Sequence, residues 1–204
     1  GADTVPPVLT IDYPVNGTYY QSTELFLNVT SNENLDSAWY SLNGSANVTM
    51  DNSSTINWNG TLSGLGTENS NNVSVYANDT SGNNGTRIVI FYTDTLAPRM
   101  NDVQANPSPA NETQTVNCSV YVTDAFDLSS VKVAENSTGS FVNHTLDLSS
   151  TGWANYSIID LDKGGCQCIF YATDSAGNSN STSVTFDVND VIAPVINVLS
   201  PSNT

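Results

Sequence analysis

The chain has 204 residues, of which 4 are basic and 20 are acidic, so its formal net charge is −16. This charge disfavours nucleic acid and anionic lipid as partners, because both are themselves negative. Asn, Ser and Thr together supply 76 residues, whereas charged residues make up only 12%. A hydrophobic share of 38%, arranged in alternating patterns, argues for folded domains rather than a disordered polar tract. No apolar run is long enough to cross a bilayer, so we expect no direct membrane insertion in this segment.

The chain contains an internal repeat whose units open with an Asp and a nearby Pro. The motif reads D-T-V-P-P at Asp3–Pro7, D-T-L-A-P at Asp94–Pro98 and D-V-I-A-P at Asp190–Pro194. A second motif, V-Y-A-N-D-T-S-G-N at Val75–Asn83, returns as F-Y-A-T-D-S-A-G-N at Phe170–Asn178. Two motifs that repeat in register indicate a tandem array with one domain per repeat, and we expect the natural protein to continue beyond this chain.

Each repeat shows the period-two alternation of short β-strands. About seven strands per repeat, with turn signals every 8–12 residues or so, predict an all-β chain of two tandem immunoglobulin-like sandwiches. We place domain 1 at residues 1–93 and domain 2 at 94–189. Residues 190–204 are predicted to be a linker with the first strand of a next domain, or a donor strand inserted into a neighbour. The expected inward-facing sets in domain 1 are Leu25, Leu27 and Val29; Ala38, Tyr40 and Leu42; Val73, Val75 and Ala77; and Ile88, Ile90 and Tyr92.

The D-x-x-G-N segments are expected in the last hairpin of each domain. Asp79 and Asp174 can each close an Asx-turn, and Gly82 and Gly177 can supply the positive φ that such a turn needs. A metal-ligand role for the two aspartates is the less favoured alternative.

The D-x-x-A-P linker, the V-Y-A-x-D-x-x-G-N strand ending and the Asn/Thr-rich filler resemble tandem Ig-like domains of prokaryotic, and in particular archaeal, cell-surface proteins. That group includes S-layer components, adhesins and extracellular filament subunits. The resemblance covers the whole chain and implies an extracellular structural module that assembles with copies of itself in a lattice or filament. The alternative is an adhesin whose loop tips bind carbohydrate or protein ligands. The family shares no catalytic residues.

The residues themselves also argue against an enzyme. His144 is the single histidine, and it lies inside an N-x-T acceptor sequence. No zinc-protease, nucleophile-elbow or phosphate-loop motif is present. The carboxylate pairs Asp124/Asp127 and Asp160/Asp162 fall in loops, where solvated turn residues are the better interpretation.

Fifteen of the 27 Asn residues stand in N-x-S/T acceptor sequences, against about 6 expected by chance. Four of them, Asn16, Asn43, Asn59 and Asn84, precede Gly and also fit hairpin turns. The strand-borne acceptors are predicted to face outward, as a covalent N-glycan requires. The full set is Asn16, Asn28, Asn43, Asn47, Asn52, Asn59, Asn72, Asn78, Asn84, Asn111, Asn117, Asn136, Asn143, Asn155 and Asn180.

Three cysteines leave one without a partner. Cys118 aligns with Leu25 and Cys168 with Val73, on the second and sixth strands, where Ig domains carry their bridge between sheets. We favour a Cys118–Cys168 disulfide, with Cys118–Cys166 as the alternative. Reduced thiols would fit poorly with an extracellular location.

Domain 1 is expected to carry an exposed apolar patch that domain 2 lacks. Such a patch usually marks a contact site, here between subunits or domains. The alternative is that its own glycans or a preceding domain cover it. The predicted patch is Trp39, Tyr76, Val89 and Phe91, and the corresponding domain 2 residues are Lys132, Tyr171, Thr185 and Asp187.

Structural Ca²⁺ is a second hypothesis, because carboxylate oxygens at domain junctions suit this cation. The alternative, favoured on frequency, is that these linker aspartates only cap turns. The candidate ligands are Asp94, Asp124, Asp127, Asp187 and Asp190.

Overall fold

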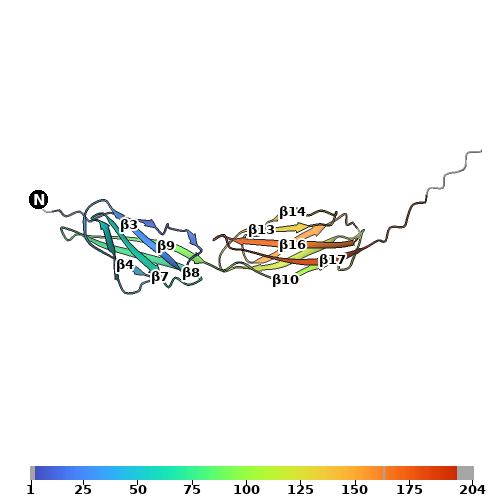
Figure 1. Cartoon of the computed structure of the whole chain (residues 1–204), viewed down its shortest axis with the longest axis horizontal. Helices are drawn as coiled ribbons and strands as arrows, with labels where there is room; N and C mark the ends of the chain where they lie inside the picture. Colours follow the sequence, from blue (N-terminus) through green and yellow to red (C-terminus); the bar gives the residue numbers. More distant parts are fainter. Residues whose placement is uncertain (1–2, 163, 197–204) are drawn as a thin grey trace, which may run out of the picture. The chain divides into compact units, whose positions relative to one another are not determined.

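The computed structural model describes residues 3–162 and 164–196. These residues form 17 β-strands and no helix, so the predicted all-β class is confirmed. The chain divides into two compact units, one built from residues up to Leu96 together with Ser175–Asn178, and the other from Ala97–Asp174 and the chain from Ser179 onward. Figure 1 shows the first in blue to green and the second in green to red. Among the described residues, no helix is present that could span a membrane.

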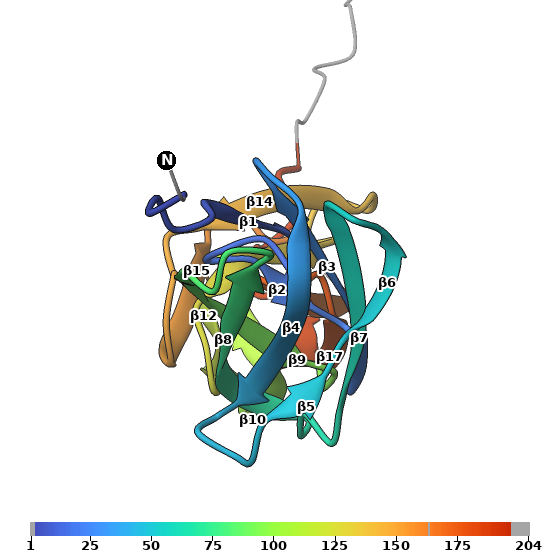
Figure 2. The same ribbon diagram turned by 90° about the vertical axis from the view of Figure 1, so that its left-hand side faces the viewer.

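The first domain is a sandwich of two sheets. One sheet has the strand order β1-β3-β7-β6, and the other has the order β2-β9-β8-β4-β5, with β2 and β9 parallel. Figure 2, which looks onto this domain, shows β6 and β7 side by side at one edge. The strands are β1 (Leu9–Tyr13), β2 (Tyr19–Tyr20), β3 (Glu24–Ser31), β4 (Leu35–Leu42), β5 (Val48–Thr49), β6 (Asp51–Ser54), β7 (Asn57–Ser63), β8 (Glu68–Asp79) and β9 (Asn84–Asp94).

Apolar side chains at alternate positions of the strands form the core of this domain. Leu27 and Val29 of one sheet and Val73 and Val75 of the other are fully buried, and Trp58 packs with them. Each such aliphatic side chain contributes about 1.5–3 kcal/mol when it leaves water. The inward faces predicted for β3, β4 and β8 are therefore confirmed.

The second domain repeats the plan without a counterpart of β6 among its described residues. Its sheets have the orders β10-β12-β15 and β11-β17-β16-β13-β14, with β11 parallel to β17. The strands are β10 (Arg99–Asn106), β11 (Ala110–Asn111), β12 (Val116–Thr123), β13 (Leu128–Glu135), β14 (Val142–Leu146), β15 (Gly152–Ile158), β16 (Gly164–Asp174) and β17 (Ser179–Asn189).

A disulfide joins the two sheets of the second domain. Cys118 on β12 and Cys168 on β16 are both fully buried and bonded, with their Cα atoms 6.5 Å apart. Cys166 lies two residues earlier on β16 as a buried free thiol. Burial is the main cause of a raised pKa for this thiol, and the nearby Glu135 carboxylate is the second. The raised pKa keeps the thiol protonated and unreactive. The disulfide thus joins Cys118 to Cys168, the favoured of the two predicted pairings.

The N-G pairs divide into two kinds. Asn43 has a φ of 51° in the hairpin between β4 and β5, and Gly17 has a φ of 77° in the turn between β1 and β2, whereas Gly60 and Gly85 lie inside β7 and β9. A Cβ on Gly60 would stand 2.8 Å from a ring carbon of Tyr40. The turn interpretation is therefore wrong for Asn59 and Asn84, because close packing rather than chain reversal requires glycine there.

The predicted opening strand of a further repeat falls partly on residues 197–204, which lie outside the described residues. Residues 190–196 form no strand. The domain limits proposed from the sequence stay predictions, with β9 extending through Asp94.

We expect replacement of Cys118 and Cys168 together by Ala to destabilise domain 2 selectively. Closing a loop of 50 residues stabilises the folded state by about 4 kcal/mol in the chain-entropy model, equivalent to roughly 15–20 °C in Tm for a domain of this size. Differential scanning calorimetry should show one transition moving and one staying. Cys166→Ala is the matched control and should shift neither by a comparable amount; equal shifts for both variants would contradict this account.

Candidate functional site

The outward face of the β2-β9-β8-β4-β5 sheet differs from the prediction in one strand. Val89 and Phe91 are only 4% and 0% exposed and belong to the core, whereas Ile88 and Ile90 are 57% and 48% exposed. The predicted interface residues Val89 and Phe91 are therefore wrong. The reason is that β9 is apolar on both faces, so alternation alone cannot orient it. Comparison with the second repeat would have oriented it, because Phe186 stands where Phe91 does and is buried.

The corrected surface, hereafter the domain 1 outer face, is aromatic and aliphatic. Trp39 on β4 stacks on Tyr76 on β8 with ring centroids 6.3 Å apart. At the other edge, Tyr19 on β2 stacks on Tyr92 on β9 at 4.7 Å. The exposed isoleucines lie between these pairs, and the face comprises Tyr19, Trp39, Tyr76, Ile88, Ile90 and Tyr92.

Along its two central strands this face is charged only at the end where Glu68 of β8 pairs with Asp94 of β9. Its other polar positions on these strands are Ser70, Asn72, Ser74 and Asn78 on β8 and Asn84 and Thr86 on β9. In domain 2 the residues in register with Ile88 and Ile90 are Ser183 and Thr185, and those in register with Trp39 and Tyr92 are Lys132 and Asp187. The asymmetry between the domains therefore exists as predicted, although through different β9 residues.

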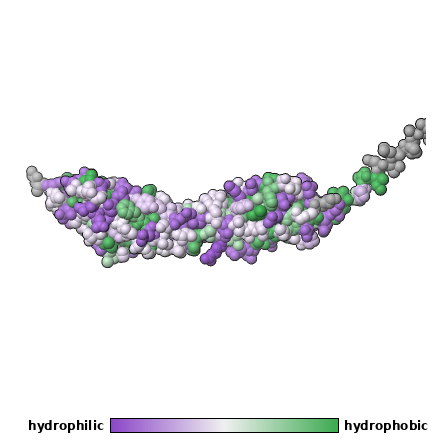
Figure 3. All heavy atoms as spheres, in the orientation of Figure 1, coloured by the Kyte–Doolittle hydropathy of each residue, from purple (hydrophilic) through white to green (hydrophobic). Residues whose placement is uncertain are grey.

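The acceptor Asn residues all reach the surface. Nine are exposed, six are half-buried and none is buried. The strand-borne Asn28, Asn72 and Asn117 stand between buried neighbours, and Asn155 stands between buried Ala154 and half-buried Tyr156, which places these Asn side chains on the outward faces. Accessibility permits glycosylation, and occupancy stays a prediction. On the side of the molecule seen in Figure 3, hydrophilic and neutral residues predominate, with small apolar groups among them.

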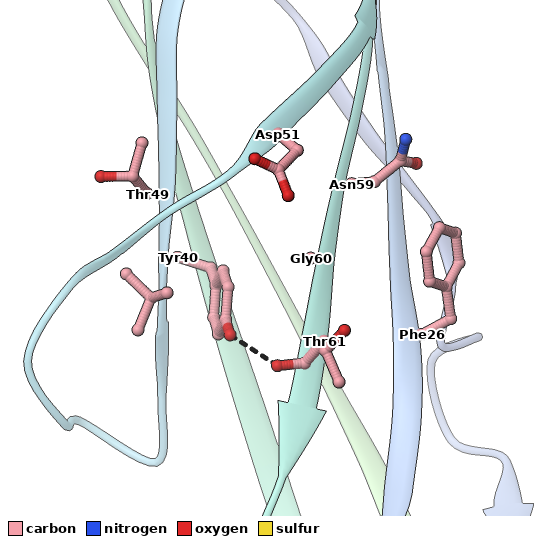
Figure 4. A pocket seen from close by; sticks show the side chains of 8 residues that line it. Phe26, Tyr40, Thr49, Asp51, Asn59, Gly60 and Thr61 are labelled. Atoms are coloured by element: carbon pink, nitrogen blue, oxygen red, sulfur yellow. Dashed lines mark hydrogen bonds between the residues drawn. The ribbon is translucent and has the colours of Figure 1, made fainter.

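A pocket of about 280 Å³ opens in domain 1 near Gly60. Phe26 of β3 and Asn59 of β7 line one side, and Asp51 of β6 lies near its centre (Figure 4). The buried Tyr40 also lines the pocket, and its hydroxyl donates a hydrogen bond to the backbone oxygen of Thr61 at 2.6 Å. The pocket thus combines an exposed aromatic ring with carboxylate, amide and hydroxyl groups. No pattern in the sequence indicates this pocket, because its residues come from separate strands.

The Asx-turn predicted at Asp79 is present. One carboxylate oxygen accepts the backbone N–H groups of Ser81 and Asn83 at 2.8 and 2.9 Å, and the other accepts the side-chain amide of Asn83 at 2.8 Å. The side-chain bond from Asn83 is the largest cause of a pKa below the ordinary aspartate value. Gly82 has the positive φ expected, at 86°, and so does Gly177 in the second repeat.

Two further carboxylates approach this turn. Oxygens of Asp3, Glu33 and Asp79 lie within 4.8 Å of one another. Removal of Glu33 from water, followed by repulsion from Asp3 and Asp79, raises the pKa of Glu33. A divalent cation would relieve this repulsion, and Ca²⁺ binding here stays a prediction. A metal-ligand role for Asp79 is the less favoured alternative raised from the sequence, whereas no sequence pattern indicated Asp3 and Glu33.

The five aspartates selected from the sequence do not form one ligand set. Asp124 and Asp174 approach each other at one end of domain 2, with carboxylate oxygens within 4.8 Å. Asp187 pairs with Gly165 at the start of β16, nine residues from Asp174 along that strand, and Asp190 follows β17 beyond it. At about 3.3 Å per residue, this separation excludes a shared site. The candidate ligands therefore divide between the two ends of domain 2, and Ca²⁺ binding at either end stays a prediction.

A buried polar cluster in domain 2 resembles a catalytic triad only in composition. Glu135 accepts from both the backbone N–H and the hydroxyl of Ser137, and its other oxygen lies 3.3 Å from His144 Nε2. Burial raises the pKa of Glu135, but these hydrogen bonds outweigh it and leave the pKa below its usual value. Because the carboxylate separates the serine from the histidine, His144 has no contact through which to activate Ser137. The absence of enzymatic activity stays a prediction.

Comparison with known proteins defines the fold class. No family model and no curated protein matches the sequence. Among solved structures, domains A168–A170 of titin match with a TM-score of 0.58 and 12% identity, over 91% of this chain and 67% of theirs. A tetra-tandem repeat from the extending region of a large adhesion protein matches with a TM-score of 0.47 and 18% identity, over 90% and 49%. A Ca²⁺-stabilized adhesin of an Antarctic bacterium matches with a TM-score of 0.39 and 17% identity, over 93% and 50%.

The titin likeness confirms that the sandwiches are immunoglobulin-like. Tandem-repeat adhesin domains are also among the structural neighbours, and this chain spans about half the length of the two adhesin fragments. At these identities the likeness concerns the fold alone.

We predict that Asp79→Asn weakens domain 1 at neutral pH and has little effect in acid. Because the pKa of Asp79 is lowered on folding, its hydrogen bonds stabilise the domain above the unfolded pKa of about 3.9, and that contribution is lost as the pH falls through the folded pKa. Thermal melts at pH 7 to 2 should show the wild-type and variant curves converging below about pH 4. Asp12→Asn, at an exposed position on β1, is the control and should leave the pH profile unchanged.

If Ca²⁺ occupies the Asp3–Glu33–Asp79 group, chelation should lower the Tm of domain 1, since a ligand that binds only the folded state stabilises it in proportion to its saturation. Melts with millimolar Ca²⁺ and with EDTA measure this, and Glu33→Gln should reduce the difference. An unchanged midpoint would leave no role for structural calcium.

Proposed function

We propose that the chain is a structural, glycosylated module of an extracellular surface layer or filament, in which copies contact one another through their Ig-like domains. The domain 1 outer face carries this proposal. It is a largely apolar surface whose outward positions on β8 and β9 are uncharged except for the Glu68–Asp94 pair at one end, on a chain of net charge −16. Copies of such a chain repel one another except where uncharged surfaces meet, so this face is the favourable place of contact.

The acceptor sites support the glycosylated part of the proposal. A surface with only 12% charged residues needs other groups to remain hydrated, and the 12 accessible acceptor Asn residues other than Asn72, Asn78 and Asn84, which lie on the domain 1 outer face, could carry them without obstructing that contact. The adhesin-like repeats among the structural neighbours agree with a surface location, although through the fold alone. The archaeal origin and the S-layer assignment rest on the sequence resemblance.

An adhesin is the second candidate, and the pocket favours it. An exposed Phe26 beside Asp51 and Asn59 offers the mixture of aromatic and polar groups that recognises a sugar. The pocket, however, lies among strands β3, β4, β5, β6 and β7 rather than at the loop tips where a ligand site was predicted.

The double variant Ile88→Ser, Ile90→Thr tests assembly through the domain 1 outer face. These are the residues that domain 2 carries in register, so the Ig fold accommodates them. We expect self-association, measured by sedimentation velocity and by electron microscopy of assembled material, to weaken at least tenfold. Domain stability should change little, because both side chains are exposed.

Ile159→Thr is the matched control. Ile159 is 64% exposed, follows β15 in domain 2 and is not part of the domain 1 outer face. It should leave assembly intact. Wild-type assembly by the double variant would contradict a contact through this face.

A further inference from the structure

The outward face of the β1-β3-β7-β6 sheet brings an acceptor Asn beside an exposed aromatic ring. Asn59 on β7 pairs directly with Asn28 on β3, and Phe26 lies two residues before Asn28 on the same face. Phe26 and Asn59 are therefore diagonal neighbours, a spacing of about 7–8 Å across which long side chains still meet. Phe26 is 53% exposed, an unusual position for a phenylalanine that packs against no core.

Only one of these two acceptor Asn residues lies at the pocket. Asn59 lines it and Asn28 does not. A sugar attached to the Asn59 amide would start at the pocket wall, with Phe26 on the same side and Asp51 ahead of it (Figure 4). The volume of about 280 Å³ is near the lower limit of small-molecule pockets, so it suits one sugar ring rather than an oligosaccharide.

The chemistry of the lining suits that occupant. One face of a pyranose presents C–H groups, which the electron-rich face of an aromatic ring attracts. The hydroxyl groups around its rim need hydrogen-bond partners, and the Asp51 carboxylate and the Thr61 side chain line the same pocket.

The second domain repeats this juxtaposition with different residues. The positions of Asn28 and Asn59 are taken by Tyr121 and Trp153, which pair across β12 and β15 with ring centroids 5.4 Å apart. Trp153 is 47% exposed. Asn155, an acceptor, lies two residues after Trp153 on the same face and diagonally from Tyr121. In both domains an exposed aromatic ring on this sheet is thus a near neighbour of an acceptor Asn on a strand. Phe26 and Asn59 are diagonal across two strands, and Trp153 and Asn155 are two residues apart on one strand.

We infer that these aromatic side chains are seats for the first sugar of N-linked glycans: Phe26 and the pocket for the glycan of Asn59, and Trp153 for the glycan of Asn155. The inference rests on the glycosylation contained in the proposed function. It assigns the pocket to the chain's own glycan, which leaves no room for an external saccharide. It also explains why large apolar side chains stand exposed on an otherwise polar face.

The test is a double-variant cycle on the full chain, produced in a host that attaches N-glycans. Glycopeptide mass spectrometry first measures occupancy at Asn59 and Asn155. The Tm of domain 1 is then followed for Phe26→Ala, Asn59→Gln and the combination, taking as domain 1 the calorimetric transition that does not respond to loss of the Cys118–Cys168 bond. We expect Phe26→Ala to lower this Tm by about 4 °C when Asn59 carries its glycan and by less than about 1 °C when position 59 is Gln.

Asn72→Gln provides the matched control. Asn72 is an exposed strand acceptor of the same domain, but it lies on β8 in the opposite sheet. Its effect and that of Phe26→Ala should simply add, because distant sites do not couple. A direct readout accompanies the cycle: ring currents of Phe26 should displace C–H proton resonances of the Asn59-linked sugar upfield, and Phe26→Leu should abolish that displacement.

Four results would overturn the inference. Glycans at other acceptors with none at Asn59 would do so while leaving the proposed function intact. A glycan at Asn59 whose effect simply adds to that of Phe26→Ala would do so as well. Finally, titration of the Asn59→Gln chain with free N-acetylglucosamine or glucose should show no binding; binding that Phe26→Ala removes would assign the pocket to an external saccharide. Absence of glycans at every acceptor would overturn this inference and the glycosylated module together.

Discussion

Each domain depends on the packing of alternate side chains from two sheets into one closed core. In domain 1 the core joins Leu27 and Val29 to Val73, Val75 and Phe91, all of them fully buried. Successive side chains of a strand point to opposite faces of the sheet. The residues that face the core therefore determine which residues face solvent. Phe91 inside places Ile90 and Tyr92 on the outer face. The surface features of this protein follow from that constraint.

The two domains share the same arrangement of core side chains and differ on the outward faces, where core packing does not restrict the residue type. Domain 2 replaces Leu25 and Val73 by a disulfide between Cys118 and Cys168, which keeps the core apolar while linking its sheets. On one outward face, domain 1 has isoleucines where domain 2 has Ser183 and Thr185. The proposed assembly contact and the proposed glycan seats occupy these freely variable faces, so both can change without loss of the fold.

Electrostatics adds a second constraint, because acidic residues outnumber basic ones fivefold. Hydrogen bonds from Asn83 and the backbone stabilise the ionised form of Asp79, whereas Glu33 beside it is pushed toward its neutral form. Elsewhere the surface is hydrated by amide and hydroxyl groups rather than by paired charges. Such a surface favours contact through uncharged patches, and it provides many positions for covalent sugars.

The sequence by itself determined the repeat, the all-β class, the Asx-turn at Asp79 and the two cysteine positions that face each other across a sandwich. Each of these depends on residues close in the chain or on the register of one repeat against the other. Tertiary structure decided the rest. The segment Ile88–Tyr92 is apolar at every position, so only the core could choose its inward face. Likewise, the pocket at Gly60 and the approach of Asp3 to Asp79 join residues far apart in the chain, and only the packing of the sheets brings them together.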